Sequence, residues 1–542
     1  MIIMNITSRF LISILSTTIF VACGEEKPLV SKLVTISCGW NTSIQLSYEE
    51  LRLETPLPFS GEHTLGRDQT AYATRIVSGA GFDEFVSNFK DQLCAKNGTT
   101  AVTNFEQAQQ AVNDAGVGIW RAAVDRAQEK RARKSTETLA SSDDRMLYWA
   151  RVQMTKILRQ WNPNFILTAE QKEQLQWEFE RSSRGQKDIH LPEGKTVDGK
   201  LYRRMIISGF DVFLLGTPGR SSTDLRNGNP SAAIALALDG KQFTLSDGSI
   251  LHIESYILPV NYDPFTKGMQ EDTLGPWFRE GPKRVDASIT LSQGREGFDL
   301  EQYNGRYHGG LEGNDGMDYC PAGQPQNVLA IGARFGEGVN PITLQGSGCN
   351  IVVPQRWYGL DTASRWIKDA PPQFSKASFP VEKILAANSQ RGIVHPAYLG
   401  AEQAADFQEG FNVVWNTAYS YFPDCAQTSV ENMSGNGAVN TMPDLSKVKD
   451  PAPSWCAREG SGGDYLSNES AYRNTVLRDA MGLTIPAGHI HVPVMNHFYI
   501  GDTANNPQDD NAITDTLFES YRTAIVGQGT NLLKAIGESL VE

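Results

Sequence analysis

The sequence lacks the residue patterns that would bind a structural metal or a nucleic acid. No Cys-x-x-Cys pair and no Cys/His cluster with metal-ligand spacing occurs in its 542 residues, so we expect no metal site. The formal net charge is −13, which argues against nucleic acid as a partner because phosphates bind concentrated Lys and Arg. The one basic cluster, residues 126–134, lies in a helix-like stretch, where we expect a solvated helix face.

The N-terminus carries the features of an export signal. Arg9 precedes an apolar run over residues 10–22, which is too short for a comfortable membrane span and ends directly before Cys23. The preceding Phe-Val-Ala resembles a bacterial lipobox, so we expect residues 1–22 to be a signal peptide and the Cys23 thiol to carry lipid. The resemblance implies an exported protein anchored in the cell envelope, at an outer membrane and facing the periplasm or the cell surface. An ordinary signal peptide with an incidental Cys23 is the alternative.

Six cysteines remain besides Cys23, and an even number in an exported chain suggests disulfides. Many pairings are possible, and the simplest joins neighbours in sequence. These pairs are Cys38 with Cys94, Cys320 with Cys349, and Cys425 with Cys456. Each would pin one long irregular segment and stabilise the fold by about 2 to 4 kcal/mol.

Hydrophobic residues make up 40% of the chain, which is ample for a conventional core, and the length allows two or three domains. After a tether over residues 23–46, we expect a helical domain over residues 47–198. Residues 104–133 and 145–161 carry apolar side chains at helical spacing, and a capping box at Thr168 begins a third helix. We find no chemical motif in this region, so its function and any protein partner stay open.

From about residue 199 the pattern changes to short β-rich runs that alternate with helical stretches. This alternation favours an α/β domain over residues 199–542, with a mostly parallel twisted sheet flanked by helices. Glycine- and proline-rich segments at about 303–354 and 395–453 are long for connections and are expected to be insertions. The expected strands are 204–208, 250–259, 287–291 and 328–331, and the expected helices are 230–238, 380–388, 468–481 and 514–526.

Four stretches of this second half share one order with a known family. They are Ile206–Phe213 followed by Asn229-Pro-Ser, Val285–Gln293 followed by Phe298–Glu301, Pro371–Pro380, and Gly462–Tyr472 followed by Gly488–Pro493. Together they resemble pyroglutamyl-peptidase I, also called pyrrolidone-carboxylate peptidase, a cysteine exopeptidase with an α/β fold. The resemblance implies an omega peptidase, an amide hydrolase that removes an N-terminal pyroglutamyl group.

The resemblance also implies three catalytic residues. Gly-Gly-Asp-Tyr-Leu-Ser corresponds to the family's Ala-Gly-Thr-Tyr-x-Cys, so Ser467 stands where the family has its cysteine. Gly-His-Ile-His-Val-Pro corresponds to Gly-x-Ile-His-Val-Pro and assigns the family's histidine to His491. Phe-Asp-Leu-Glu assigns the carboxylate to Glu301, and Glu296 is an alternative that depends on a small gap. His489 would share a strand face with His491, and we expect it to be structural or exposed.

Three further residues are implied to bind the substrate. In the family two phenylalanines sandwich the pyroglutamyl ring, and that role would fall on Phe210 and Phe213. Gln293 corresponds to the glutamine at the end of the family's second strand. Without the resemblance, the two phenylalanines would be ordinary core residues. Val212 replaces the proline between them, so a different acyl group is an open alternative.

The same residues make chemical sense without the family. Ser467 follows two glycines and opens an expected helix, whose backbone amides would stabilise an oxyanion. A serine hydroxyl is scarcely ionised at neutral pH, so His491 would have to take its proton and Glu301 would orient the imidazole. No metal and no organic cofactor is implied. The expected substrate is a small peptide or amide.

The serine leaves two interpretations of the site. In the first, the site is rebuilt for a Ser-His-Glu hydrolase that cleaves an N-terminal pyroglutamyl or similar amide. In the second, the protein is an inactive lipoprotein that serves as a ligand-binding or envelope scaffold protein. Retention of His491 and Glu301 favours the hydrolase, because a protein that only binds would have no chemical use for either.

Overall fold

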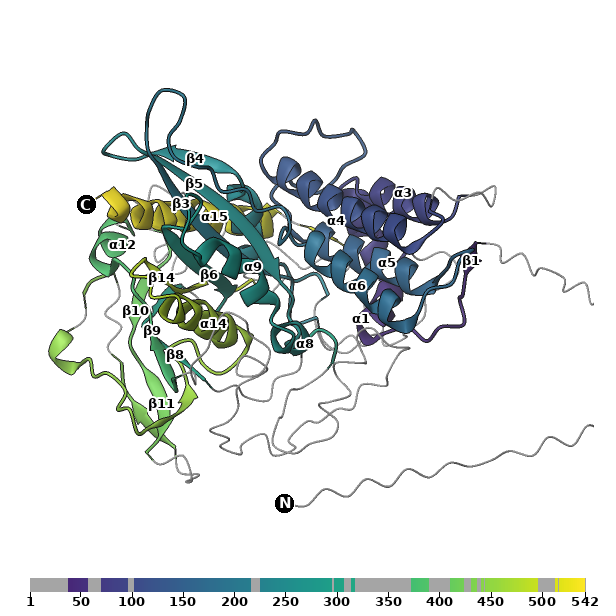
Figure 1. Cartoon of the computed structure of the whole chain (residues 1–542). Helices are drawn as coiled ribbons and strands as arrows, with labels where there is room; N and C mark the ends of the chain where they lie inside the picture. The colour runs from purple at the N-terminus through teal and green to yellow at the C-terminus, as the bar shows by residue number, and fades with distance from the viewer. Residues whose placement is uncertain are drawn as a thin grey trace, which may run out of the picture. The chain divides into compact units, whose positions relative to one another are not determined.

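The computed structural model describes residues 38–56, 70–95, 102–215, 225–294, 297–306, 313–316, 372–388, 410–423, 430–435, 440–442, 444–495, 512–514 and 516–541 (Figure 1). The expected signal peptide, Cys23 and the expected pair of Cys320 with Cys349 lie outside these ranges. Among the helices within them, none combines the length and the apolar character needed to cross a membrane.

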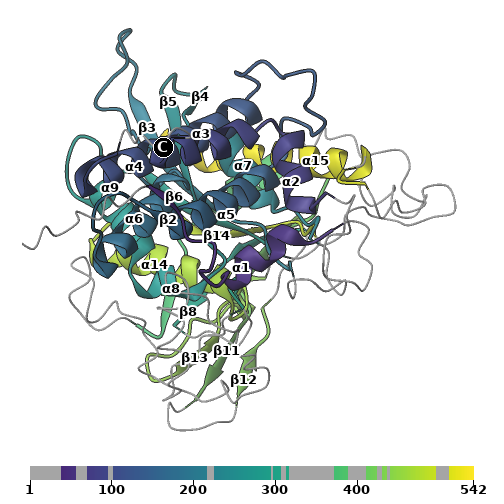
Figure 2. The ribbon, with the colours of Figure 1, turned by 90° about the vertical axis from the view of Figure 1, so that its right-hand side faces the viewer.

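The N-terminal part of the described chain is helical because its apolar residues recur at helical spacing. In α5, for example, Leu147, Ala150, Met154 and Leu158 are all buried. Helix α4 packs against α6, and α2 and α3 pack against α5 (Figures 1 and 2). The helices are α1 (Tyr48–Leu51), followed by a short 3-10 helix (Arg52–Glu54), α2 (Tyr72–Gly79), α3 (Asp83–Leu93), α4 (Phe105–Ala127), α5 (Arg145–Gln160) and α6 (Ala169–Ser182).

Two local expectations for this region have opposite outcomes. The capping box is confirmed, because the Thr168 side chain accepts from the backbone of Gln171 at the start of α6. The basic cluster is solvated at Lys130, Arg133 and Lys134, but the expected helix face is wrong, because α4 ends at Ala127 and Arg126 is buried. Its guanidinium donates to the Leu139 carbonyl over 2.9 Å and lies 3.7 Å from the Glu137 carboxylate. A loop that folds back over a helix leaves no periodic signal in the sequence.

One of the expected disulfides is confirmed. Cys38 and Cys94 are bonded, with their Cα atoms 5.8 Å apart, so the segment before β1 (Gly39–Trp40) is tied to the end of α3. Strand β1 also pairs antiparallel with β2 (Trp161–Asn162). Cys456 is disulfide-bonded as well, and its partner lies outside the described residues, as does Cys425.

The second part of the chain is built on a seven-stranded sheet in the order β10-β7-β14-β6-β3-β5-β4. Neighbours are parallel from β14 through β6 and β3 to β5, and again between β10 and β7. Strands β7 and β4 run antiparallel to β14 and β5. The predicted α/β class, with a mostly parallel sheet after a helical N-terminal region, is confirmed. The strands are β3 (Tyr202–Phe210), β4 (Lys241–Thr244), β5 (Ile250–Leu258), β6 (Ala287–Gln293), β7 (Phe298–Glu301), β10 (Val413–Asn416) and β14 (Ala487–Val492).

Helices cover both faces of this sheet, because its central strands are buried on both sides. Met205 and Ile207 of β3 pack into the core shared with α7, α12 and α15, whereas Ile206 and Phe210 pack with α9 and α14. Alternate residues therefore face opposite layers, and this alternation decides which polar side chains meet. The helices are α7 (Pro230–Leu238), α8 (Tyr262–Thr266), α9 (Met269–Phe278), α12 (Val381–Asn388), α14 (Leu466–Ala480) and α15 (Thr516–Glu538), which continues into a 3-10 turn (Ser539–Val541).

Two small antiparallel sheets accompany the large one. Residues 395–453, expected to be an insertion, contain β10 at the edge of the large sheet as well as β11 and β12. The expected strand 328–331 lies outside the described residues. The small sheets are formed by β8 (Tyr303–Gly305) with β9 (Phe374–Lys376), and by β12 (Glu431–Met433), β11 (Tyr419–Phe422) and β13 (Cys456–Glu459), and a 3-10 turn (Leu445–Lys447) precedes β13.

Candidate active site

A small pocket opens where three parallel strands end. Phe210 ends β3, Val260 follows β5, and Gln293 ends β6. These residues lie at the same edge of the sheet because the three strands are parallel. The N-terminus of α14 reaches the same edge with Ser467. The pocket contains about 280 Å³ of empty space, its open mouth included, and is lined by Phe210, Phe213, Asn229, Val260, Ser292, Gln293, Tyr465, Leu466 and Ser467.

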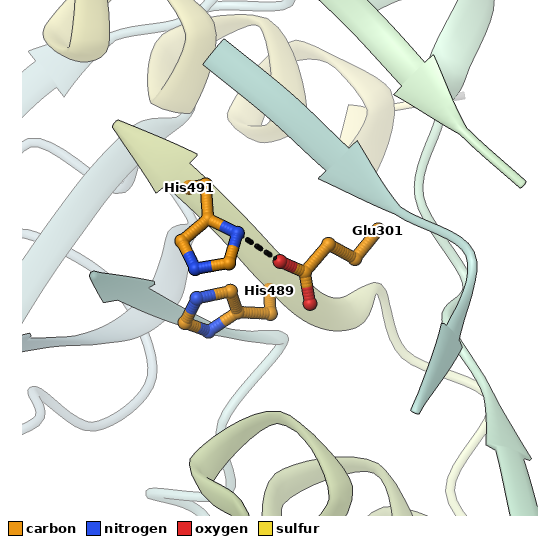
Figure 3. Close-up of side chains that lie close together, drawn as sticks. All are labelled: Glu301, His489 and His491. Atoms are coloured by element: carbon orange, nitrogen blue, oxygen red, sulfur yellow. Dashed lines mark ion pairs between the residues drawn. The ribbon is translucent and has the colours of Figure 1, made fainter. Parts of the chain in front are cut away.

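A buried imidazole and carboxylate stand next to this pocket. His491 pairs through Nδ1 with Oε1 of Glu301, which is fully buried (Figure 3). Strands β14 and β7 run antiparallel with Glu301 opposite His489 and Asp299 opposite His491, so the carboxylate meets His491 diagonally, two positions along the same face of β14. On the other side of β14, His491 lies in register with Ser292 of β6, a pocket residue. The predicted base and the predicted carboxylate are thus in contact, while the alternative Glu296 lies outside the described residues.

Two glycines leave room for this pair. A Cβ at Gly462 would overlap the Glu301 carboxylate, and a Cβ at Gly294 would overlap the His491 ring. Any side chain at either position would therefore displace the acid or the imidazole. Gly462, the first residue of the Gly-Gly pair before the serine, thus leaves space for the Glu301 carboxylate in addition to forming the turn.

Ser467 enters the pocket from the first turn of α14. It is the second residue of this helix, after the extended N-cap residue Tyr465, and is buried apart from its pocket face. The first amides of a helix have no partner within the helix, and they carry the positive end of its dipole. Ser467 thus stands where the backbone favours negative charge on a neighbouring oxygen.

The residues predicted to bind substrate also line this pocket. Phe210 is buried and stacks on Phe265 at 6.2 Å between ring centroids, and Phe213 is half-buried. Oε1 of Gln293 accepts from the Met495 amide over 2.7 Å. Nε2 of Gln293 is buried and has no hydrogen-bond partner among the described residues, so it offers a donor to a bound molecule.

His489 is buried, and its surroundings differ from those of His491. Its Nδ1 lies 2.7 Å from Oγ1 of Thr290, and its Nε2 lies 2.7 Å from Oγ of Ser292. Burial, with a further contribution from nearby His491, lowers the pKa of His489 well below its usual value. His489 is therefore neutral. We expected it to be structural or exposed, and it is buried.

Glu301, His489 and His491 bring atoms of the kind that bind metals within 4.8 Å of one another. Each imidazole is nevertheless already engaged, His491 by the carboxylate and His489 by two hydroxyls. Both oxygens of Glu301 are buried and make no hydrogen bond among the described residues, so this carboxylate relies on its ion pair with His491. We assign no metal to this group of side chains, and the expected absence of a cofactor stays a prediction.

The helical region holds the loop that carries the two phenylalanines. Oδ2 of Asp211 accepts from Arg151 over 2.6 Å and from Arg184 over 2.8 Å, and all three side chains are buried. Val212 belongs to the hydrophobic core of the helices. The pocket wall between Phe210 and Phe213 is thus fixed from a part of the chain without a recognisable motif.

A second contact from the helical region reaches the pocket residue Asn229. The Asp144 carboxylate accepts from the Asn229 amide over 3.0 Å, and the Asn229 side chain caps α7. Nδ2 of Asn229 also donates to the Asp211 carbonyl over 2.7 Å. Sequence reasoning did not place Asn229, Ser292, Tyr465 or Val260 at the site, although the quoted motifs contain Asn229, Ser292 and Tyr465.

Comparison with known proteins gives both domain matches and whole-chain similarity. The model of the PA0049 C-terminal domain matches residues 204–496, and the model of the PA0049 N-terminal domain matches residues 31–180. An uncharacterised protein of Pseudomonas aeruginosa strain PAO1, PA0049, is 57% identical over 524 residues, which cover 96% of this chain and 93% of that protein.

Similar solved structures are pyrrolidone carboxyl peptidases of low identity. A mutant of the enzyme from Pyrococcus furiosus is 17% identical with a TM-score of 0.30, covering 62% of this chain and 99% of that chain. The enzyme from Thermococcus litoralis is 15% identical with a TM-score of 0.29, covering 62% and 96%. The domain match over more than half of the chain and the 57% identical relative show that this chain belongs to the PA0049 family.

Proposed function

We propose that this protein is an amide hydrolase that removes an N-terminal pyroglutamyl or similar acyl group through Ser467, His491 and Glu301. The observation that carries the proposal is the buried pair of His491 and Glu301 beside a pocket that Ser467 lines. An imidazole backed by a carboxylate is the base that a serine nucleophile requires.

The proposed reaction proceeds in two steps. The Ser467 hydroxyl oxygen attacks the amide carbonyl carbon while His491 takes the hydroxyl proton, and Glu301 stabilises the imidazolium. Amides in the first turn of α14 stabilise the oxyanion. The tetrahedral intermediate then collapses, the C–N bond breaks, and His491 returns the proton to the leaving amine. Water attacks the acyl-serine ester in the same way and restores the free hydroxyl.

The pocket supports a small acyl group rather than a long peptide on the acyl side. Its enclosed space is small, since the 280 Å³ includes the open mouth, and Phe210, Phe213 and Tyr465 contribute aromatic lining. Small ligands are held in sites of this kind mainly by apolar contact, with a few polar groups that fix their orientation. Phe210 and Phe213 supply the apolar contact, and Nε2 of Gln293 supplies a donor.

The test is hydrolysis of a pyroglutamyl-aminomethylcoumarin substrate by the full-length protein in detergent, beside its Ser467→Ala and Ser467→Cys variants. We expect release of coumarin by the native protein and a loss of at least about 1,000-fold in kcat for the alanine variant. Native activity that survives Ser467→Ala would refute the assigned nucleophile. A silent native protein with an active cysteine variant would instead support the inactive, ligand-binding interpretation.

We also propose that the protein is exported and anchored by lipid on Cys23. The support is the apolar run that ends directly before this cysteine. Replacement by Ser, Cys23→Ser, should move the protein from the membrane fraction to the soluble fraction and remove the added lipid mass from its N-terminal peptide. If the protein keeps its distribution between the fractions and its N-terminal peptide keeps its mass, Cys23 carries no lipid and the N-terminus is an ordinary signal peptide.

A further inference from the structure

A short turn from the first expected insertion lies against the rim of the pocket. Residues 313–316 form this turn, in which the Gly316 amide donates to the Gly313 carbonyl over 2.9 Å. A Cβ at Gly313 would lie 2.8 Å from the Val260 carbonyl oxygen. Gly316 has a φ of +72°, and a Cβ there would lie 2.7 Å from the Tyr48 ring. The two glycines therefore let the turn fit between α1 and the pocket.

Asn314, in this turn, contacts two parts of the pocket wall. Its amide donates to the Val260 carbonyl and its Nδ2 donates to the Val212 carbonyl, both over 2.7 Å. Val260 lines the pocket, and Val212 lies between the two phenylalanines that line it. Asn314 and Val212 are both buried, so water does not compete for these bonds. One residue thus joins the loop after β3 to the loop after β5.

The other side of the turn is held from the N-terminal region. Arg52, which directly follows α1, is buried and donates through its guanidinium to the Asn314 carbonyl. Oδ1 of Asn261 accepts from the Asp315 amide over 3.0 Å, and its Nδ2 donates to the Glu49 carboxylate of α1 over 3.2 Å. The turn is therefore fixed to α1 as well as to the pocket wall.

The loop after β3, residues 211–214, depends on such contacts for its shape. Leu214 has a φ of +60°, which a leucine rarely adopts without support from its surroundings. Three buried asparagine side chains donate to carbonyls of this loop, and Asn314 differs from the other two because it also bonds Val260. The pairs are Asn229 with Asp211 over 2.7 Å, Asn314 with Val212 over 2.7 Å, and Asn227 with Leu214 over 3.3 Å.

We propose, on the basis of the proposed function, that Asn314 is a positioning residue that holds the Phe213 loop near Val260 and so sets the size of acyl group that the pocket accepts. Loss of its side-chain amide would leave the buried Val212 carbonyl without this donor, and the loop would move to recover a partner. A wider pocket holds a small acyl group more weakly and rejects a larger one less strongly. Ser467 and His491 stand on other elements, so the chemical step should change little.

The first arm of the experiment measures hydrolysis by the full-length protein in detergent. Native protein and Asn314→Ala are compared on pyroglutamyl-aminomethylcoumarin and on its homologue with a six-membered lactam ring. In the variant we expect KM for the pyroglutamyl substrate to rise about tenfold, the worth of one hydrogen bond, with kcat within about twofold. The preference for the smaller ring, as a ratio of kcat/KM, should fall by about the same factor.

The control for this arm is Asn304→Ala, which removes another buried asparagine amide, paired with Thr475 outside the pocket. It should leave KM and the ring preference unchanged. A fall in kcat at constant KM in Asn314→Ala, or an unchanged ring preference, would overturn the inference.

The second arm needs no turnover, so it separates this inference from the proposed function. Hydrogen exchange is followed by mass spectrometry at the Asp211 amide, which donates to the Leu258 carbonyl over 2.9 Å. In Asn314→Ala we expect the peptide that spans residues 210–214 to exchange about tenfold faster, while the peptide that spans β6 keeps its rate. Unchanged exchange at residues 210–214 would also overturn the inference. If the native protein hydrolyses neither substrate while exchange quickens as expected, the proposed function fails and the positioning of the wall by Asn314 is supported.

Discussion

The two parts of the described chain hold the pocket in different ways. The sheet side supplies Ser292, Gln293, His491 and Glu301 from strand ends, where the backbone ladder sets their positions. The helical side supplies no residue that touches the pocket space, yet its buried arginines hold Asp211 between the two phenylalanines. The residues of the proposed chemistry and the contacts that anchor the pocket wall at Asp211 thus come from separate regions, so each set can be damaged without the other.

The largest effect should follow from breaking the sheet side at Glu301. In Glu301→Gln the imidazolium loses its charge partner, and we expect kcat to fall about 10,000-fold with little change in the melting temperature. The matched control is Glu254→Gln, which alters another buried His–Glu pair, with His252, away from the pocket. If both variants lose activity equally, the effect is structural and the comparison fails.

The next largest effect should come from the helical side. Asp211→Asn leaves Arg151 and Arg184 facing a neutral amide, and we expect the free energy of unfolding to fall by about 3 to 5 kcal/mol. The folded fraction should show a raised KM and a nearly unchanged kcat. Arg121→Gln is the control, because 61% of the Arg121 side chain is exposed in its pair with Asp188 and it should change stability by less than about 1 kcal/mol. A reduced kcat with an unchanged KM would contradict the inference that the helical side holds the pocket wall and leaves the catalytic residues unaffected.

A smaller effect tests the space behind the imidazole. Gly294→Ala adds one methyl group against His491, and we expect kcat to fall about 100-fold, because a displaced base misses its proton. Gly118→Ala, in α4 with open space around its Cα, should leave kcat unchanged and stabilise the helix slightly. Full activity of the Gly294 variant would show that the ring position tolerates movement.

The last effect concerns the pH dependence of stability. Burial, and then the charge of Asp143, raises the pKa of Asp144 to about 7. The folded state therefore holds this proton more tightly than the unfolded state, and stability falls as pH rises from about 4 to 7, by at most about 1.4 kcal/mol per pH unit from this group. Asp144→Asn keeps an acceptor for the Asn229 amide and should flatten this slope in urea unfolding. An unchanged slope would mean that other groups set it.

The sheet side was predictable because its residues stand in short motifs with a fixed order. Ser467, His491 and Glu301 were assigned from three such motifs, and the structure brings the last two into contact and puts the first into the neighbouring pocket. The Cys38–Cys94 bond and the capping box at Thr168 were predictable for the same reason, since each depends on few residues.

The helical side was not predictable, because its contacts join residues far apart in sequence. Arg151 and Asp211 are 60 positions apart, and nothing in the local pattern distinguishes a buried arginine from an exposed one. The contact between Ser292 and His489 was also not predicted, because it depends on the register between β6 and β14. Register is set by the whole sheet, and a single sequence does not state it.

Side chains alternate between the two faces of β14, and this alternation restricts which changes of length the strand can accept. His489 and His491 face the layer of α14, while Ile490 and Val492 face the core shared with α12 and α15. Insertion or deletion of one residue within the strand would exchange the faces, sending both imidazoles into an apolar core and two aliphatic side chains toward the pocket. Length changes in this strand are therefore tolerable only in pairs, and relatives that keep the chemistry should preserve the spacing of the two histidines more strictly than the length of any loop around them.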